Sequence, residues 1–162
     1  MQFFTYDWAM GRDDSDAVGA YQSFLATLDP DSAPRRFAET VSLNDAWLDR
    51  VMYDAAARTL SVLLLTGDNQ SDYWHTELTY DGAILVGLPV LRDALQNRPT
   101  EIWYDEFAFR DAGLSHSFLM APTDMRKARD RQFHIGFSSY AFSRRPAAGR
   151  ILMTPEDRSV WR

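Results

Sequence analysis

The sequence predicts an α+β fold in which N-terminal helices pack on a mostly antiparallel meander sheet of about six to seven strands. Apolar side chains recur at helical spacing near the N-terminus, where Val18, Tyr21 and Leu25 form one stripe. From residue 47 onward, short runs rich in β-branched and aromatic residues alternate with turn-forming residues, as is typical of antiparallel strands. The helices therefore come before the sheet instead of alternating with its strands.

We expect a single α+β domain that covers residues 1–162, because no repeat, low-complexity tract or linker divides the chain. Residues 1–42 should be mainly helical. Residues 47–143 should be mainly sheet, with a short helix near 90–98. The sequence Thr-Pro-Glu-Asp, which combines a cap, a proline and two acids, predicts a short terminal helix at 154–162.

Three short helices are expected before the sheet. Thr5 stands where a helix N-cap would sit, and Asp7 in the first turn favours the positive end of the helix dipole. Asp14 or Ser15 can cap the second helix. Pro34 suits the first position of the third helix, since that position needs no backbone N–H.

The sheet is predicted to be centred on residues 59–66, whose sequence TLSVLLLT suits a strand covered on both faces. Further along the chain, Asp81 and Gly82 are the pair of residues that a type I′ turn prefers. This turn predicts a hairpin that pairs Leu78 with Leu85. The hairpin would complete four consecutive antiparallel strands.

Further strands are predicted at residues 100–110, 114–121 and 131–142. A three-residue turn between the first two would place Glu106 opposite Phe118. Because side chains alternate along a strand, this register sets which of them share a face.

Composition and charge exclude several classes of protein. The chain has no cysteine, so it has no disulfides and no thiolate metal sites. Its beginning carries neither a basic region nor a long apolar run, and we therefore expect a cytoplasmic protein that does not bind membranes. A net charge of -6 opposes non-specific binding to nucleic acid. Lys127 is the single lysine among 17 basic residues, a bias that indicates a bacterial genome rich in G and C.

Two short motifs resemble those of an uncharacterised family of small bacterial proteins. Residues 4–8 read Phe-Thr-x-x-Trp, which is similar to the opening of that family. Residues 43–46 read Leu-Asn-Asp-Ala, which is similar to the family's Leu-His-Asp-Ala at the switch from helix to sheet, with Asn44 in place of the His. The resemblance implies the same order of helices and sheet. The family has no assigned activity that it could imply.

The familiar enzyme motifs are absent from the sequence. There is no Gly-x-Ser-x-Gly, no Walker loop, no dinucleotide-binding glycine pattern and no His-Glu-x-x-His. This absence favours a protein that is not an enzyme and that uses neither a cofactor nor a metal ion.

One face of the predicted sheet carries side chains that suit binding. Aromatic and methionine side chains with interspersed charges are typical of a protein interface. We therefore predict a non-enzymatic protein-binding module, of which an immunity protein is one example, with a protein partner that is basic and so complements the acidic chain. The residues of this predicted binding face are Tyr104, Glu106, His116, Phe118, Met120 and His134.

Three alternatives stay open at this point. His116, Glu106 and His134 could form a metal or acid–base site that serves a small-ligand binder or a hydrolase. The same face could be the contact of a homo-oligomer, or a helix of this chain at 90–98 could cover it.

Asp105 lies between Trp103 and Phe107 on its strand, so its side chain faces the core if that face of the sheet is the buried one. A buried carboxylate needs a partner or changes its pKa. An ion pair with an arginine is the expected solution, and a general acid with a raised pKa is the alternative.

Overall fold

The computed structural model describes residues 1–68, 72–96, 101–110, 113–122 and 131–147. In these residues, four helices accompany one antiparallel sheet of eight strands, which confirms the α+β class. The helices are α1 (Tyr6–Ala9), α2 (Ala17–Leu25), α3 (Ala33–Thr40) and α4 (Leu88–Gln96). The strands are β1 (Ala46–Asp54), β2 (Thr59–Asp68), β3 (Asp72–Asp81), β4 (Ile84–Val86), β5 (Glu101–Arg110), β6 (Gly113–Met120), β7 (Gln132–Gly136) and β8 (Ser139–Pro146).

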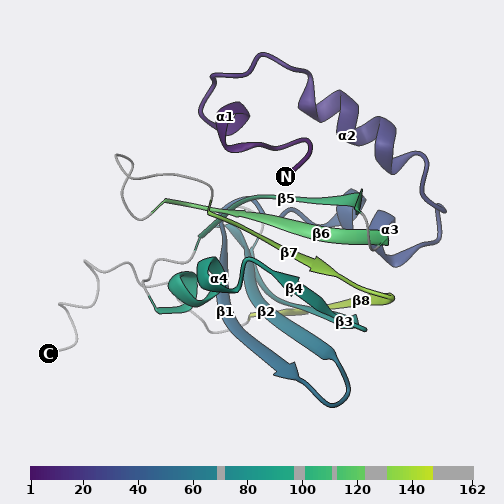
Figure 1. Cartoon of the computed structure of the whole chain (residues 1–162), viewed down its shortest axis with the longest axis vertical. Coiled ribbons are helices and arrows are strands. Elements are labelled where there is room, and N and C mark those ends of the chain that lie inside the picture. Colours follow the sequence, from purple (N-terminus) through teal and green to yellow (C-terminus); the bar gives the residue numbers. More distant parts are fainter. Residues whose placement is uncertain (69–71, 97–100, 111–112, 123–130, 148–162) are drawn as a thin grey trace, which may run out of the picture.

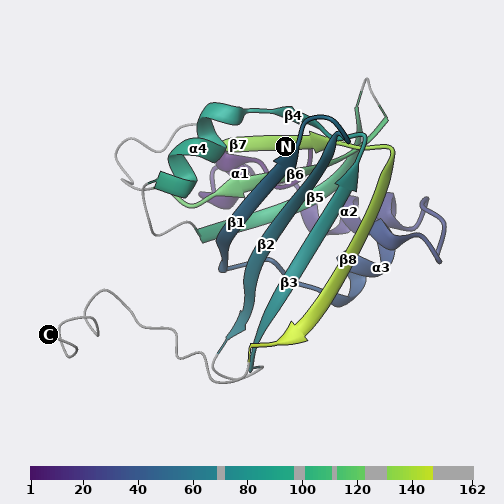
Figure 2. The same ribbon diagram turned by 90° about the horizontal axis from the view of Figure 1, so that it is seen from below.

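The sheet is rolled. The chain passes from β3, near one end of the strand order, directly into the edge strand β4 at the other end, and from β7 into the opposite edge strand β8 in the same way. The strand order is β4-β7-β6-β5-β1-β2-β3-β8. β3 pairs with β8 as far as Asp81 and Ser139, and β4 pairs with β7 from Ile84 and Gly136 in the same register. The two ladders thus form one bent ribbon that joins both ends of the strand order. Figure 2 shows the two halves of the sheet crossing each other.

The hairpin predicted at Asp81 and Gly82 does not form, so this prediction is wrong. Leu85 pairs with β7 and not with Leu78, whose strand β3 lies between β2 and β8. Gly82 has a φ of 63°, but Asp81 is not among the residues with positive φ, so a type I′ turn does not form. Ser138 donates hydrogen bonds from its backbone N–H and its hydroxyl to the Asp81 carbonyl, at 2.9 and 3.0 Å, and these hold the corner of the ribbon.

The described residues contain eight strands instead of six or seven, because the last predicted strand is divided. Residues 131–142 change direction at 137–138, where β7 ends and β8 begins. β7 lies between β4 and β6, whereas β8 pairs with β3. The helix predicted at 154–162 lies outside the described residues.

The N-terminal helices begin largely as their caps predict. The Thr5 hydroxyl accepts the Trp8 N–H at 3.1 Å, which confirms the cap of α1. α2 begins slightly later than expected, after Asp16, whose carboxylate accepts the Gly19 N–H at 2.9 Å. Pro34 is the second residue of α3, one position later than predicted. Figure 1 shows α1 and α2 above β5 and β6, with α4 beside β1 and β4.

Aromatic side chains fill the inside of the rolled sheet. Phe37 of α3 is fully buried, and its ring centroid lies 5.1 Å from that of Phe142 and 5.7 Å from that of His116. Phe107 and Tyr140 also contact this ring edge-on. α3 therefore closes the inner face with a single large side chain.

Replacing Phe37 with alanine should lower the free energy of unfolding by about 3–5 kcal/mol, because it removes a fully buried ring and leaves a cavity. Urea denaturation measures the change. The matched control is Met52→Ala on β1, whose side chain is 52% exposed and should contribute less than about 0.5 kcal/mol. A loss for Phe37→Ala as small as that of the control would contradict the role of α3.

Candidate functional site

The register of β5 and β6 differs by one residue from the predicted register. Glu106 pairs with Ser117 instead of Phe118, and Phe107 pairs with His116. Arg110 pairs with Gly113, so the connection holds two residues and not three. Because successive side chains of a strand point to opposite faces, this shift separates residues that were expected to lie together.

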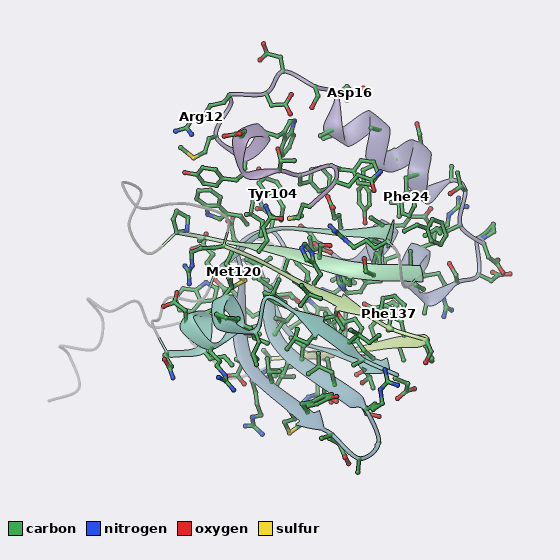
Figure 3. The ribbon with its side chains drawn as sticks, viewed as in Figure 1. Arg12, Asp16, Phe24, Tyr104, Met120 and Phe137 are labelled. Carbon is green, nitrogen blue, oxygen red and sulfur yellow. The ribbon has the colours of Figure 1, made fainter. Side chains whose placement is uncertain are left out.

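Four of the six residues of the predicted binding face are buried, so the exposed surface expected there does not form. Glu106, His116 and Phe118 have no exposed surface, and Met120 is 2% exposed. Phe118 stacks on Phe133 inside the rolled sheet, with ring centroids 4.7 Å apart. The helix expected at 90–98 forms as α4, and its Leu91 and Ala94 belong to the same buried cluster as Phe118 and Met120. Figure 3 shows Tyr104 on the α1–α2 side and Phe137 between the two halves of the sheet.

Glu106 faces the outside of the rolled sheet and holds the N-terminal segment there. Its carboxylate accepts the backbone N–H of Phe3 at 2.8 Å, that of Phe4 at 2.9 Å, and that of Gln2. Phe4 packs in turn on Tyr21 of α2 and on Tyr104 of β5. A buried carboxylate thus replaces water as the partner of three consecutive amides.

Glu106→Gln should lower the free energy of unfolding by about 1.5–3 kcal/mol, because an amide presents an NH₂ group to donors that need acceptors. Hydrogen exchange of the amides of residues 2–4 should accelerate together with this loss. Glu77→Gln on β3 makes the same change of charge at an exposed position and should leave both quantities unchanged. Amides that stay protected in Glu106→Gln would contradict the proposed attachment.

His134 and His116 lie on opposite faces, so the predicted site of two histidines and Glu106 does not form. His134 is joined to Ser117 by a 2.8 Å hydrogen bond on the outer face. Burial, together with the positive charges of Arg110 and the N-terminal amino group, lowers the pKa of His134 to about 4. In the part of the chain that the structure describes, no three His, Cys, Asp or Glu residues come together as metal ligands would.

The lowered pKa of His134 makes stability depend on pH. Between its ordinary pKa of 6.5 and its pKa of about 4, the unfolded chain binds a proton that the folded chain does not. Stability should therefore rise with pH across this window and level off above it. Thermal melts of His134→Gln should show a weaker rise over the same window, with unchanged behaviour above pH 7. An NMR titration of His134 that gives an ordinary pKa would contradict this explanation.

Asp105 faces the inside of the rolled sheet, where its partner is a histidine and not the expected arginine. Its Oδ2 atom lies 2.9 Å from Nε2 of His116, and Nδ1 of His116 lies 2.7 Å from the Tyr80 hydroxyl. A neutral imidazole satisfies both contacts, because the Tyr80 hydroxyl can donate to Nδ1 while Nε2–H donates to the carboxylate. Burial, and then the charge of Asp105, raise the pKa of Tyr80, which keeps its hydroxyl protonated.

Only the Asp105 end of this hydrogen-bonded chain reaches the surface. The Asp105 side chain is 14% exposed, whereas His116 has no exposed surface. Asp105 lies in the wall of an open cavity of about 500 Å³, which is lined by residues of α1, α2, the end of α3 and β5. The carboxylate is thus the group that a ligand in the cavity can meet.

A bulge in β5 lies beside this cavity. Ile102 pairs with Met120 and Tyr104 with Leu119, so Trp103 falls outside the regular register. Trp103, Tyr104 and Asp105 all line the cavity, so the irregular part of β5 forms one side of it.

Aromatic rings form much of the cavity wall and are held by contacts within the chain. The rings of Trp8 and Tyr104 meet edge-on with centroids 5.2 Å apart, and those of Phe4 and Tyr104 stack at 5.6 Å. The indole N–H of Trp8 donates to the Ser15 carbonyl at 3.2 Å. The Tyr21 hydroxyl accepts the Phe107 N–H at 3.0 Å, and burial raises the pKa of that hydroxyl. The wall is therefore formed before any ligand binds.

The charged groups of the cavity wall are acidic. Among the described residues that line it, Glu39 and Asp105 carry carboxylates and none is basic. Glu39 is already paired with Arg35 at 2.8 Å, whereas Asp105 is hydrogen-bonded to the imidazole of His116 at 2.9 Å. Asp105 therefore supplies the negative charge that a ligand can neutralise.

Both short motifs of the sequence contribute to this cavity. Phe4 and Trp8 come from the first motif and Asn44 from the second, and all three line the wall. Among the cavity residues, only Tyr104 was predicted to bind. Asp105 was identified as a buried carboxylate, but not as part of a cavity wall. The meeting of the two motifs was the signal that could have located the site.

Comparison of the chain with protein-family models, with curated proteins and with solved structures found no match. In the described part of the chain, no helix has the length and hydrophobicity needed to cross a membrane.

Proposed function

We propose that the protein binds a small organic cation in the cavity beside Asp105. The observation that carries this proposal is a partly exposed carboxylate in a preformed aromatic wall. A volume of about 500 Å³ suits a small molecule. Quaternary and primary ammonium groups bind to such sites, since the faces of aromatic rings attract cations.

The surroundings of Asp105 favour a charged ligand over a neutral one. In the neutral form that its two hydrogen bonds allow, His116 supports the carboxylate without cancelling its charge. The low polarity of aromatic surroundings strengthens the attraction between this charge and a cation. Thr40 and Ser42 add hydroxyl groups to the wall that can orient the ligand.

Binding is favoured over hydrolysis by the position of His116. Both of its ring nitrogens are engaged within the chain, one with Tyr80 and the other with Asp105. A general base must reach the group whose proton it removes, and no ring nitrogen of His116 faces the cavity. The protein-binding hypothesis loses the surface on which it depended, because Phe118 and Met120 are buried.

Choline and its neutral isostere 3,3-dimethylbutan-1-ol provide the test. Isothermal titration should show choline binding about tenfold or more tightly than the isostere, because only choline neutralises Asp105. Asp105→Asn should weaken choline binding by a similar factor, since it removes the charge but keeps an oxygen that can accept from His116. Glu77→Gln, outside the cavity, should bind as the unaltered protein does.

Equal affinities for choline and its isostere would contradict the proposal. So would full choline affinity in Asp105→Asn. The indole N–H signals of Trp8 and Trp103 should shift on titration, and shifts confined to other residues would place the ligand elsewhere.

A further inference from the structure

A second concave surface lies on another part of the molecule, between α4, β4 and the β1–β2 hairpin. Its volume is about 530 Å³, and it shares no lining residue with the cavity beside Asp105. We call it the α4 groove and define it by the lining residues Tyr53, Arg58, Ile84, Leu88, Arg92 and Leu95. Figure 1 shows α4 running beside β1 and β4 at this place.

Large apolar side chains are exposed in the α4 groove. Tyr53 is 54% exposed, Ile84 46% and Leu88 39%, while Leu91 beneath them is buried. Val86, which follows on β4, is 57% exposed. Apolar side chains gathered in one groove are typical of a binding surface.

The strand β4 has a free edge at the α4 groove. In the described residues β4 pairs with β7 alone, and it stands at one end of the strand order. The Ala83 N–H, just before β4, donates to the Arg58 carbonyl at 2.8 Å, so the free edge starts beside the β1–β2 hairpin. An unpaired edge of this kind can accept an additional extended segment.

Two arginines give the α4 groove its charge. Neither Arg58 nor Arg92 forms an ion pair with an acidic residue of the described chain. Asp93, the neighbour of Arg92, is paired with Arg131 at 2.6 Å. Two cations at an apolar groove, in a chain whose net charge is -6, complement carboxylates of a binding partner.

We propose that the α4 groove is a docking site for an extended segment of a partner protein in which apolar and acidic residues alternate. The backbone of the segment adds to the free edge of β4. Alternate side chains of a strand point to opposite sides, so its apolar side chains pack on Ile84 and Leu88 while its carboxylates reach Arg58 and Arg92. The charge next to the groove, and not the net charge of the chain, selects the partner, which is therefore acidic here and not basic as the sequence predicted.

A random peptide library displayed on phage provides the probe. Selection on the unaltered protein, with counter-selection on Arg92→Glu, should enrich peptides that alternate apolar and acidic residues. A synthetic copy of an enriched peptide should bind at least about tenfold more weakly to Arg92→Glu and to Ile84→Asp by fluorescence anisotropy. Arg36→Glu on α3 makes the same charge change outside the groove and should bind normally.

Arg92 and Ile84 are both exposed, so the two variants should melt at the temperature of the unaltered protein. If Ile84→Asp melts at a lower temperature, the comparison with Arg92→Glu is sufficient for the test. Enriched peptides that are basic, or that bind the Arg92→Glu variant equally well, would overturn the proposal. No enrichment would also overturn it. Self-association that Arg92→Glu abolishes would assign the groove to a second copy of this chain. Asp105→Asn should bind the peptide normally, which separates this test from that of the cavity.

Discussion

The register between β5 and β6 decides which side chains enter the interior of the rolled sheet. With Phe107 opposite His116, the side chain of Asp105 meets His116, and the hydrogen-bonded chain continues to Tyr80. On the other face, Glu106 turns outward to bind the N-terminal segment. The interior is not ideal throughout, since the buried Tyr140 hydroxyl has no partner among the described residues, at a cost of about 1–3 kcal/mol. The packing of its ring on Tyr80 and Phe107 offsets that cost.

The cavity beside Asp105 depends on the attachment of the N-terminal segment to Glu106. Phe4 donates its backbone N–H to this carboxylate and presents its ring to the cavity. Trp8 follows on α1, where the Thr5 cap begins the helix. Stability and the binding site are therefore coupled: a change that releases the first residues also removes one wall of the cavity.

The charges of this protein are arranged locally in a way that its net charge does not reveal. The cavity places a carboxylate among aromatic rings, whereas the α4 groove on a different surface places two arginines among aliphatic side chains. Exposed charges more than about 10 Å apart are largely screened from each other at ordinary salt concentrations. The two surfaces can therefore select ligands of opposite charge within one acidic chain.

Local chemistry in the sequence determined the class of fold, the caps of the first helices and the approximate positions of most strands, because these depend on neighbouring residues. The tertiary structure alone decided the partners of those strands. Asp81 and Gly82 prefer a hairpin in isolation, but β7 and β8 continue past them as the second half of a bent ribbon. Likewise, a two-residue connection in place of three moved His116 and Phe118 from the predicted surface to the interior. Side-chain alternation makes burial depend on register, and register is set by contacts between segments far apart in the chain.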